Sequence, residues 1–269
     1  MAGTNSIQVS PSARKRPEDF EASEQVDAMR DSALFAGLTQ QECRMLALSA
    51  SRKTFESGKP LFMEGKLIRE VMLIVSGSVK LSKVRSIEGE VILWINGRND
   101  ILEIPLEKGK SRYTCTAHAV ERCSVLRWEA RLLHEVMREY PQIRANVNNI
   151  MSQRLGELEQ RFRELTTEGI ESRLARMLLR LVSSIGKYHS QGVLLSVTRE
   201  ELAKISGMSM FTTSRIVSSW GDENLIIPLR KAIVVRDPGR FASACNAVGM
   251  SATAGRPVVA EPGMCLVSI

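Results

Sequence analysis

The chain has 269 residues, of which 43% are hydrophobic and 25% charged, a balance typical of a globular protein with room for two modest domains. Its longest apolar runs are far too short to cross a bilayer, and its polar N-terminus lacks the apolar core of a secretory signal. These features exclude a membrane protein and predict a cytoplasmic one. The net charge of +7 permits a polyanionic partner such as a nucleic acid without identifying one.

The N-terminal half begins with a polar stretch, residues 1–27, that carries no helical period and is expected to be a disordered tail. Between Phe55 and Trp128, short apolar runs are separated by glycines about every ten residues. This pattern predicts an all-β sandwich or barrel, which we assign to a domain over residues 28–138. Ser76–Gly77 lies between two β-branched runs and predicts a tight hairpin, because glycine tolerates a positive φ.

From Glu129 to about Thr167 the periodicity becomes helical. Apolar residues recur at spacings of four and three along one narrow stripe, with charged residues on both sides. The stripe favours a dimerisation helix over residues 139–167 that pairs with its twin, and the alternative is a helix packed against its own β domain. The stripe, called the seam below, consists of Met151, Leu155, Leu158, Phe162 and Leu165.

The C-terminal third, residues 168–240, contains a helix-turn-helix pattern. It opens with an amphipathic helix over Ile170–Ile185 and an expected loop over Gly186–Gly192. Thr198 is then a good N-cap, with Glu201 at the capping-box spacing, and Gly207 ends this short helix in a left-handed conformation. A second helix capped by Ser209 would project its first turns toward a major groove.

The outward positions of that second helix predict DNA contacts. Arg215 can donate two hydrogen bonds to a guanine edge, and the hydroxyls near the helix N-terminus suit phosphate oxygens. A basic hairpin, Leu225–Pro228 with Ala232–Arg236, follows as the wing of a winged helix, and the tail over residues 241–269 is expected to be loose. The predicted contact residues are Ser209, Met210, Phe211, Thr212, Ser214, Arg215, Arg230 and Lys231.

Three stretches in this order resemble the cyclic-AMP receptor protein / fumarate-nitrate regulator (CRP/FNR) superfamily: LFAGLTQQECRMLA, GKPLFMEGKLIREVMLIVSGSVKL and VTREELAKISGMSMFTTSRIV. The resemblance covers about Leu34 to Asp237. It implies an α+β fold with an N-terminal β-roll of the cyclic-nucleotide-binding jelly-roll type, a long dimerisation helix and a C-terminal winged helix-turn-helix. It also implies a bacterial homodimer that binds palindromic double-stranded DNA, with RNA polymerase as a further candidate partner. A signal at the β-roll, or protein abundance alone, would set the angle between the paired helices.

The resemblance assigns some base-reading residues and removes others. Arg215 matches the family's base-reading arginine, and Ser214 stands where oxygen-responsive members have a reading serine. Phe211 replaces a glutamate that contacts cytosine in many members, so it should contact a thymine methyl or merely pack. The usual half-site is therefore not expected.

The family's cyclic-AMP pocket is altered in this chain. Its ribose-binding carboxylate is replaced by Ile104, beside an anionic Glu103, and its phosphate-binding arginine is replaced by Tyr113. Arg112 is adjacent, but strand alternation turns it to the opposite face. A buried phosphate without a bidentate partner is costly, so the sequence predicts no binding of cyclic AMP.

The five cysteines do not predict a metal or cofactor site. Oxygen-sensing members of the family cluster several cysteines near the N-terminus, whereas only Cys43 precedes the β-roll here. Cys115 and His118 fall on opposite faces of a predicted strand, so with Cys123 they are interpreted as packing residues rather than haem ligands. A thiol switch at Cys115 or Cys123 is the alternative, which no nearby basic cluster favours.

Two other classes of protein are alternatives to a DNA-binding regulator. One is a signal-binding β-roll protein whose winged helix docks another protein, an alternative that the apolar pair Met210 and Phe211 favours. The other is an enzyme, which the sequence does not support, because its three histidines lie far apart and no motif links a nucleophile to a base.

Overall fold

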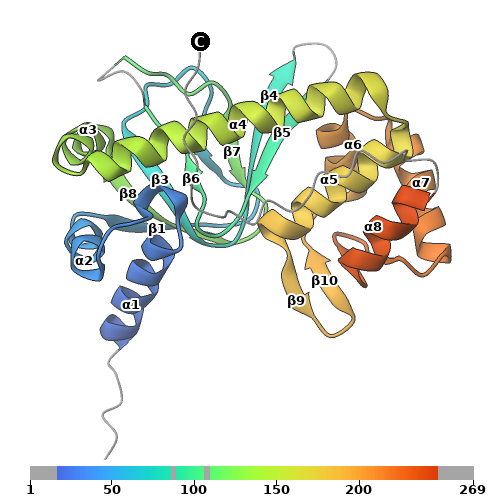
Figure 1. The fold of residues 1–269 in the computed structure, drawn as a ribbon, viewed down its shortest axis with the longest axis horizontal. Coiled ribbons are helices and arrows are strands. Elements are labelled where there is room, and N and C mark those ends of the chain that lie inside the picture. The colour runs from blue at the N-terminus through green and yellow to red at the C-terminus, as the bar shows by residue number, and fades with distance from the viewer. Residues whose placement is uncertain (1–16, 86–88, 106–109, 248–269) are drawn as a thin grey trace, which may run out of the picture.

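The computed structural model describes residues 17–85, 89–105 and 110–247, and two antiparallel sheets of four strands form its N-terminal half (Figure 1). One sheet has the strand order β1-β8-β3-β6 and the other the order β2-β7-β4-β5. The strands are β1 (Ser51–Phe55), β2 (Pro60–Phe62), β3 (Glu70–Ser76), β4 (Val79–Arg85), β5 (Gly89–Asn96), β6 (Ile101–Leu102), β7 (Thr116–Ala119) and β8 (Cys123–Glu129). This is the predicted β-roll.

Strand β3 shows why the domain has two cores. Its side chains alternate between faces, and five consecutive apolar residues are buried. Met72 and Ile74 enter the core between the two sheets, whereas Val71, Leu73 and Val75 enter a second core shared with helices. A strand covered on both faces reads as a continuous apolar run rather than as an alternating one.

The predicted hairpin at Ser76–Gly77 is wrong in its pairing. Gly77 does have a positive φ of 84°, and a Cβ there would lie 2.5 Å from the Arg122 carbonyl oxygen. However, β3 pairs with β8 and β6, while β4 pairs with β5 and β7. The turn therefore carries the chain from one sheet to the other.

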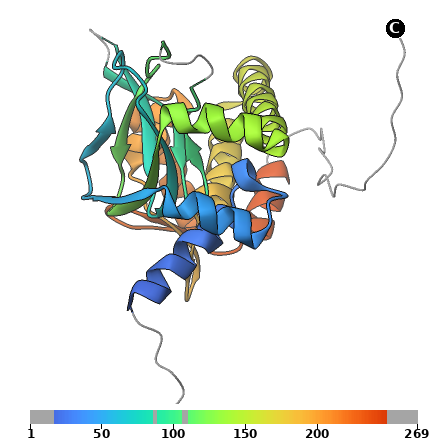
Figure 2. The same ribbon diagram turned by 90° about the vertical axis from the view of Figure 1, so that its left-hand side faces the viewer.

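Helices cover one side of the β-roll, as the turned view in Figure 2 shows. The Trp128 indole donates a hydrogen bond of 2.9 Å to the Leu46 carbonyl, and the Asn146 amide donates to the Leu34 and Ala36 carbonyls. These bonds attach the N-terminal helices to the strands and to the long helix. The helices are α1 (Pro17–Arg30), the 3₁₀ helix η1 (Ala33–Phe35), α2 (Gln40–Leu48), α3 (Ala130–Glu139) and α4 (Pro141–Thr167).

Helix α1 corrects the expected disorder of residues 1–27, since it begins at Pro17. Val26 and Met29, three residues apart, are buried in the helical core, and Glu24 pairs with Arg52 at 3.0 Å. These long-range contacts hold a segment whose own sequence is polar. Residues 1–16 lie outside the described ranges.

Helix α4 confirms the predicted long helix. Pro141 at its first position matches the preference of proline for a helix start, and Tyr140 separates α4 from α3. In Figure 1, α4 runs from the β-roll across to the C-terminal domain. It therefore connects the two parts of the molecule.

The C-terminal domain is a winged helix whose small sheet has the order β11-β12-β10-β9. Its core joins Leu178, Val217, Trp220 and Phe241 with Ile92 and Ile95 of β5, so it packs directly on the β-roll. The elements are α5 (Ile170–Ile185), β9 (Lys187–His189), β10 (Gly192–Leu195), α6 (Arg199–Ser206), α7 (Met210–Asp222), β11 (Ile226–Pro228), β12 (Ile233–Val235) and α8 (Pro238–Ala247).

Two expectations for this domain are corrected. The segment Gly186–Gly192 is not a loop throughout, because β9 and β10 pair as a hairpin that extends the sheet. The tail over residues 241–269 is not loose at its start, because α8 reaches Ala247 and buries Phe241 and Cys245. Residues 248–269 are outside the described ranges. Among the helices that the structure describes, none is long and apolar enough to cross a membrane.

Candidate nucleic-acid interface

Both helices of the helix-turn-helix begin at the predicted caps. The Thr198 hydroxyl accepts a hydrogen bond of 3.1 Å from the Glu201 backbone N–H, and the Glu201 carboxylate accepts one of 3.0 Å from the Thr198 N–H. Gly207 ends α6 in the left-handed region, with φ 66° and ψ 34°. These features confirm the first helix and its stop, and they set the steep turn into α7.

Helix α7 has one buried face and one exposed face. Thr213, Ile216, Val217 and Trp220 are buried, as predicted. The Trp220 indole donates a hydrogen bond of 3.1 Å to the Glu171 carboxylate and meets the Phe241 ring edge-on at 4.9 Å. The inner face is thereby held on α5 and α8, which leaves the opposite face free to meet a partner.

The exposed face of α7 carries the predicted base-reading residues. The Arg215 side chain is exposed and has no hydrogen bond or ion pair with any other residue that the structure describes. Met210 and Phe211 are 48% and 79% exposed, and Ser214 is half-buried beside them. An uncommitted guanidinium on the outer face of a second helix is the arrangement that reads guanine in a major groove.

Two hydroxyls define the first turn of α7. The Ser209 oxygen accepts a hydrogen bond of 3.1 Å from the Thr212 N–H and lies 2.9 Å from the Thr212 hydroxyl oxygen. This cap orders the turn that precedes the exposed residues. It also leaves a helix N-terminus with polar groups at the position where a phosphate would lie.

The wing is a short hairpin with basic residues at its tip. Strands β11 and β12 pair, and the Leu229 N–H donates to the Ala232 carbonyl at 2.9 Å to close the turn. Arg230 and Lys231 are exposed in this turn. Their placement is that expected for phosphate contacts beside a recognition helix.

The seam on α4 is largely uncovered in a single chain. Leu155, Leu158, Phe162 and Leu165 are 58%, 51%, 70% and 55% exposed. Met151 differs, because it is half-buried against the helical core of its own β-roll. A row of apolar side chains of this size marks an interaction surface.

Two aromatic side chains pack in the core between the two sheets of the β-roll. The rings of Phe62 and Tyr113 stack at 3.9 Å with an angle of 7°, and the Tyr113 hydroxyl donates to the Glu70 carbonyl. Burial and the nearby carboxylates of Glu70 and Glu103 raise the pKa of Tyr113 to about 12. Arg112 is exposed and donates to the Gly65 carbonyl, as strand alternation predicted.

The four cysteines in the described ranges, Cys43, Cys115, Cys123 and Cys245, are buried and free of disulfide bonds. Burial raises the pKa of the Cys115, Cys123 and Cys245 thiols to about 12, and burial also raises the pKa of Cys43. A protonated thiol is a poor nucleophile, which argues against a thiol switch at Cys115 or Cys123. No group of three or more His, Cys, Asp or Glu suited to a metal ion occurs in the part of the chain described, and Cys265 lies outside it.

A polar junction joins the winged helix to the β-roll. Lys204 of α6 pairs with Glu90 of β5 at 3.2 Å, and Lys80 of β4 lies 3.5 Å from Glu90 and 3.6 Å from Glu201. A Cβ at Gly97 would lie only 2.0 Å from the Ser184 carbonyl oxygen, so glycine is needed for this close approach. The sequence did not predict these contacts, because their partners are far apart along the chain.

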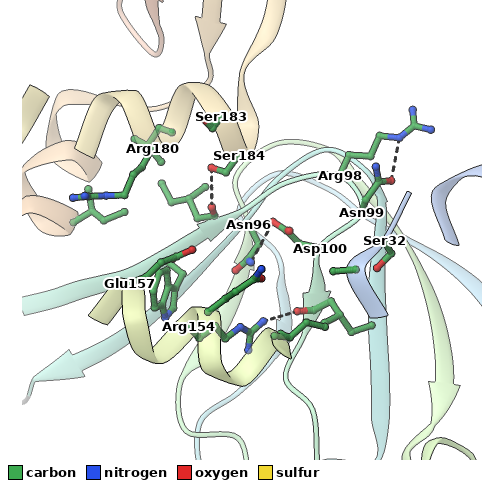
Figure 3. A pocket seen from close by; sticks show the side chains of 18 of the residues that line it. Ser32, Asn96, Arg98, Asn99, Asp100, Arg154, Glu157, Arg180, Ser183 and Ser184 are labelled. Atoms are coloured by element: carbon green, nitrogen blue, oxygen red, sulfur yellow. Dashed lines mark hydrogen bonds between the residues drawn. The ribbon is translucent and has the colours of Figure 1, made fainter. Parts of the chain in front are cut away.

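A cavity of about 630 Å³ lies beside this junction, between the turn after β5, α4 and α5 (Figure 3). Its wall includes Arg154, which donates to the Ile101 carbonyl, and Asp100, whose pKa is raised because it is buried. Arg161 stacks over Trp94 at 4.0 Å, and burial together with the charge of Arg180 lowers the pKa of Arg161 to about 10. The residues that line this cavity are different from the buried residues of the core between the two sheets of the β-roll.

The ion pair between Glu164 and Arg180 connects α4 to α5. Each carboxylate oxygen accepts a hydrogen bond of 2.8 Å from the guanidinium, and the Glu164 side chain is only 4% exposed. Burial would raise the pKa of Glu164, but the hydrogen bonds and charge of Arg180 outweigh it and lower that pKa. The bidentate pair therefore links the C-terminal part of α4 to α5, the first helix of the winged-helix domain.

Replacing Glu164 with glutamine should lower the free energy of unfolding by about 3 kcal/mol at pH 7, because it leaves a largely buried guanidinium unpaired. Because the folded-state pKa is lowered, the stabilisation is complete above the unfolded pKa of about 4.3 and is lost as the pH falls through the folded value. The difference between the two proteins in urea denaturation should shrink in acid. The matched substitution Glu56→Gln, in an exposed pair with Arg122, should cost less than about 1 kcal/mol, and an equal loss in both variants would contradict the account.

Comparison with known families agrees with these observations. The model of the Crp-like helix-turn-helix domain matches residues 172–244, and that of the cyclic nucleotide-binding domain matches residues 52–140. The chain is 26% identical over 198 residues to the "Cyclic AMP receptor protein" of Thermus thermophilus, covering 74% of this chain and 89% of that protein. It is 27% identical over 185 residues to the "cAMP-activated global transcriptional regulator CRP" of Salmonella typhimurium, covering 67% and 87%.

Solved structures share the fold. FixK2 from Bradyrhizobium japonicum superposes with a TM-score of 0.62 at 19% identity, over 72% of this chain and 96% of that one. The "c-di-GMP Responsive Global Regulator CLP" from Xanthomonas campestris gives a TM-score of 0.62 at 19% identity, over 74% of this chain and all of that one. At such identities the likeness supports the architecture alone.

Proposed function

Since the chain belongs to the CRP/FNR superfamily of transcription regulators, which bind DNA through a helix-turn-helix and are not enzymes, we propose that it binds a palindromic site as a homodimer without control by cyclic AMP. The observation that carries the proposal is the free guanidinium of Arg215 on the exposed face of α7. Because the DNA of a bacterium lies in its cytoplasm, we place the protein there. A contact with RNA polymerase stays a prediction.

The homodimer follows from the seam. The seam is an apolar row with charged residues on both sides, and most of its side chains are exposed in a single chain. Pairing two α4 helices would remove these side chains from water. In a dimer with two-fold symmetry the two recognition helices run in opposite directions and lie on the same face of the duplex, where they meet major grooves one helical turn apart. The angle between the two α4 helices then sets whether both α7 helices fit at once.

Independence from cyclic AMP follows from the altered pocket. Tyr113 stands in place of the phosphate-binding arginine and is engaged with Phe62 and the Glu70 carbonyl. The Glu103 carboxylate accepts a hydrogen bond of 3.5 Å from the Cys115 thiol. Its negative charge would repel the phosphate of a cyclic nucleotide bound beside it. An anion that is buried without a cationic partner is unfavourable.

Isothermal calorimetry of the purified chain with cyclic AMP should therefore show no saturable heat, and cyclic AMP should leave the affinity for DNA unchanged. The effect expected from the missing bidentate contact is a Kd weaker than about 1 mM. A micromolar Kd, or a shift in DNA affinity on addition of cyclic AMP, would contradict this part of the proposal.

The DNA-binding function itself is tested by selecting genomic fragments with dialysed, effector-free, full-length protein and sequencing what is retained. The proposal expects enrichment of a two-fold symmetric motif whose half-sites are centred about 10 base pairs apart. Uniform, salt-sensitive retention of fragments without a shared motif would count against it, since phosphate contacts alone produce that behaviour.

A further inference from the structure

The first turn of α7 presents two large apolar side chains to solvent. Phe211 is 79% exposed and Met210 is 48% exposed, on a helix whose other apolar residues, Ile216, Val217 and Trp220, are buried. Neither exposed residue belongs to a hydrophobic core that the structure describes. The two adjacent side chains form a small apolar patch at the start of the exposed face of α7.

The position of Phe211 directs it toward the same partner as the predicted base readers. It precedes Ser214 and Arg215 by three and four residues, which places the three on one side of the helix. Helical side chains also lean toward the helix N-terminus, so the Phe211 ring covers the leading end of α7. The Ser209–Thr212 cap orders this turn, and thus the ring projects from a defined backbone.

We propose that Phe211 is a specificity-determining residue that selects a thymine in each half-site by packing on its C5-methyl group. The inference rests on the proposed DNA-binding function and names what that site reads. In the major groove thymine is the base that presents a methyl group, and the other groups used for recognition there are hydrogen-bond donors and acceptors. A phenyl ring over those polar edges would remove their water and return no hydrogen bond.

The expected gain in DNA affinity can be estimated from the free energy of transferring one methyl group out of water. Contact with a single methyl is expected to strengthen binding about fourfold per half-site, and about fifteenfold when both half-sites contribute. The effect is small enough that binding persists without it, and large enough to measure by fluorescence anisotropy.

The experiment replaces each thymine of the selected palindrome, one symmetric pair at a time, with deoxyuridine, which lacks only the methyl group. Full-length wild-type protein should lose about fifteenfold in affinity at one pair and little at the others. Phe211→Ala should bind the thymine and deoxyuridine versions of that pair equally. Selection repeated with Phe211→Glu should replace this thymine with cytosine, because a carboxylate can accept a hydrogen bond from the cytosine amino group.

Tyr188→Ala is the matched control, because it removes another exposed aromatic side chain, 93% exposed on β9 and away from α7. It should keep the sensitivity to deoxyuridine, and circular dichroism should show both variants folded, since neither side chain is buried. Absence of any methyl-sensitive thymine would overturn the proposal, as would a sensitivity that persists unchanged in Phe211→Ala. In both cases a recovered palindrome would leave the DNA-binding function standing, whereas failure to select any motif would remove both.

Discussion

Arg215→Ala should strongly weaken selective DNA binding while leaving the protein folded and dimeric. Arg215 is exposed and uncommitted, so its removal costs no internal contact of the described residues. Each bidentate contact with guanine contributes about 1–3 kcal/mol of discrimination, and a dimer makes two, so affinity for the specific site should fall at least about 30-fold. Binding to a scrambled duplex should fall far less.

The matched control is Arg138→Ala, an exposed arginine on α3 of the β-roll, which removes the same charge away from α7. Anisotropy titrations at constant salt should show unchanged specificity for this variant. The charge reversal Arg215→Glu separates the two candidate functions of the winged helix, because a DNA-binding surface should fail completely and a protein-docking surface need not. Equal specificity in wild type and Arg215→Ala would contradict the assignment of α7 as the recognition helix.

The double substitution Leu158→Glu/Phe162→Glu should convert the protein to a monomer. Both side chains are at least half exposed in the single chain, and carboxylates facing their own copies would repel across the paired helices. Sedimentation should give 29.9 kDa for the variant and about 60 kDa for wild type, twice the chain mass. Affinity for the palindrome should fall at least about 100-fold, because two tethered half-sites become independent.

Met45→Glu controls for the introduction of a charge at an exposed apolar position. Met45 is 61% exposed on α2, away from the seam, so this variant should remain a dimer and bind normally. If the seam variant sediments as a dimer, the long helix packs another way and the role of the seam is wrong.

Local signals predicted the helix-turn-helix in detail. The capping box at Thr198, the left-handed Gly207 and the Ser209 cap each depend on residues within four positions of one another. Such signals are complete in the sequence, because the hydrogen bonds they describe form within one turn. The same is true of the apolar spacing that placed α5 and α4.

Long-range pairing could not be predicted in the same way. Gly77 has the positive φ that a hairpin turn uses. Nevertheless β4 joins the other sheet, because it pairs with β7, a strand up to forty residues further along the chain. Helix α1 has a polar sequence and α8 has no clear apolar stripe, and both are held by a few buried residues such as Met29 and Phe241. Their stability comes from packing rather than from helical periodicity.

The junction between the domains was also beyond sequence analysis. Lys204 and Glu90 are 114 residues apart, and the close contact of Gly97 with Ser184 appears only once both domains have folded. The cavity beside them is formed by α4, α5 and the turn after β5, none of which signals it alone. The altered residues of the nucleotide pocket, by contrast, could be recognised in the sequence, because the family resemblance indicates which residues normally stand at those positions.

The central claim is that two effector-free chains occupy one palindrome. The most direct measurement titrates dialysed full-length protein against a fluorescent duplex carrying the selected palindrome, and against the same duplex with one half-site scrambled. The account predicts two chains per duplex and a loss of at least about 100-fold on scrambling. One chain per duplex, or equal affinity for the two duplexes, would contradict it.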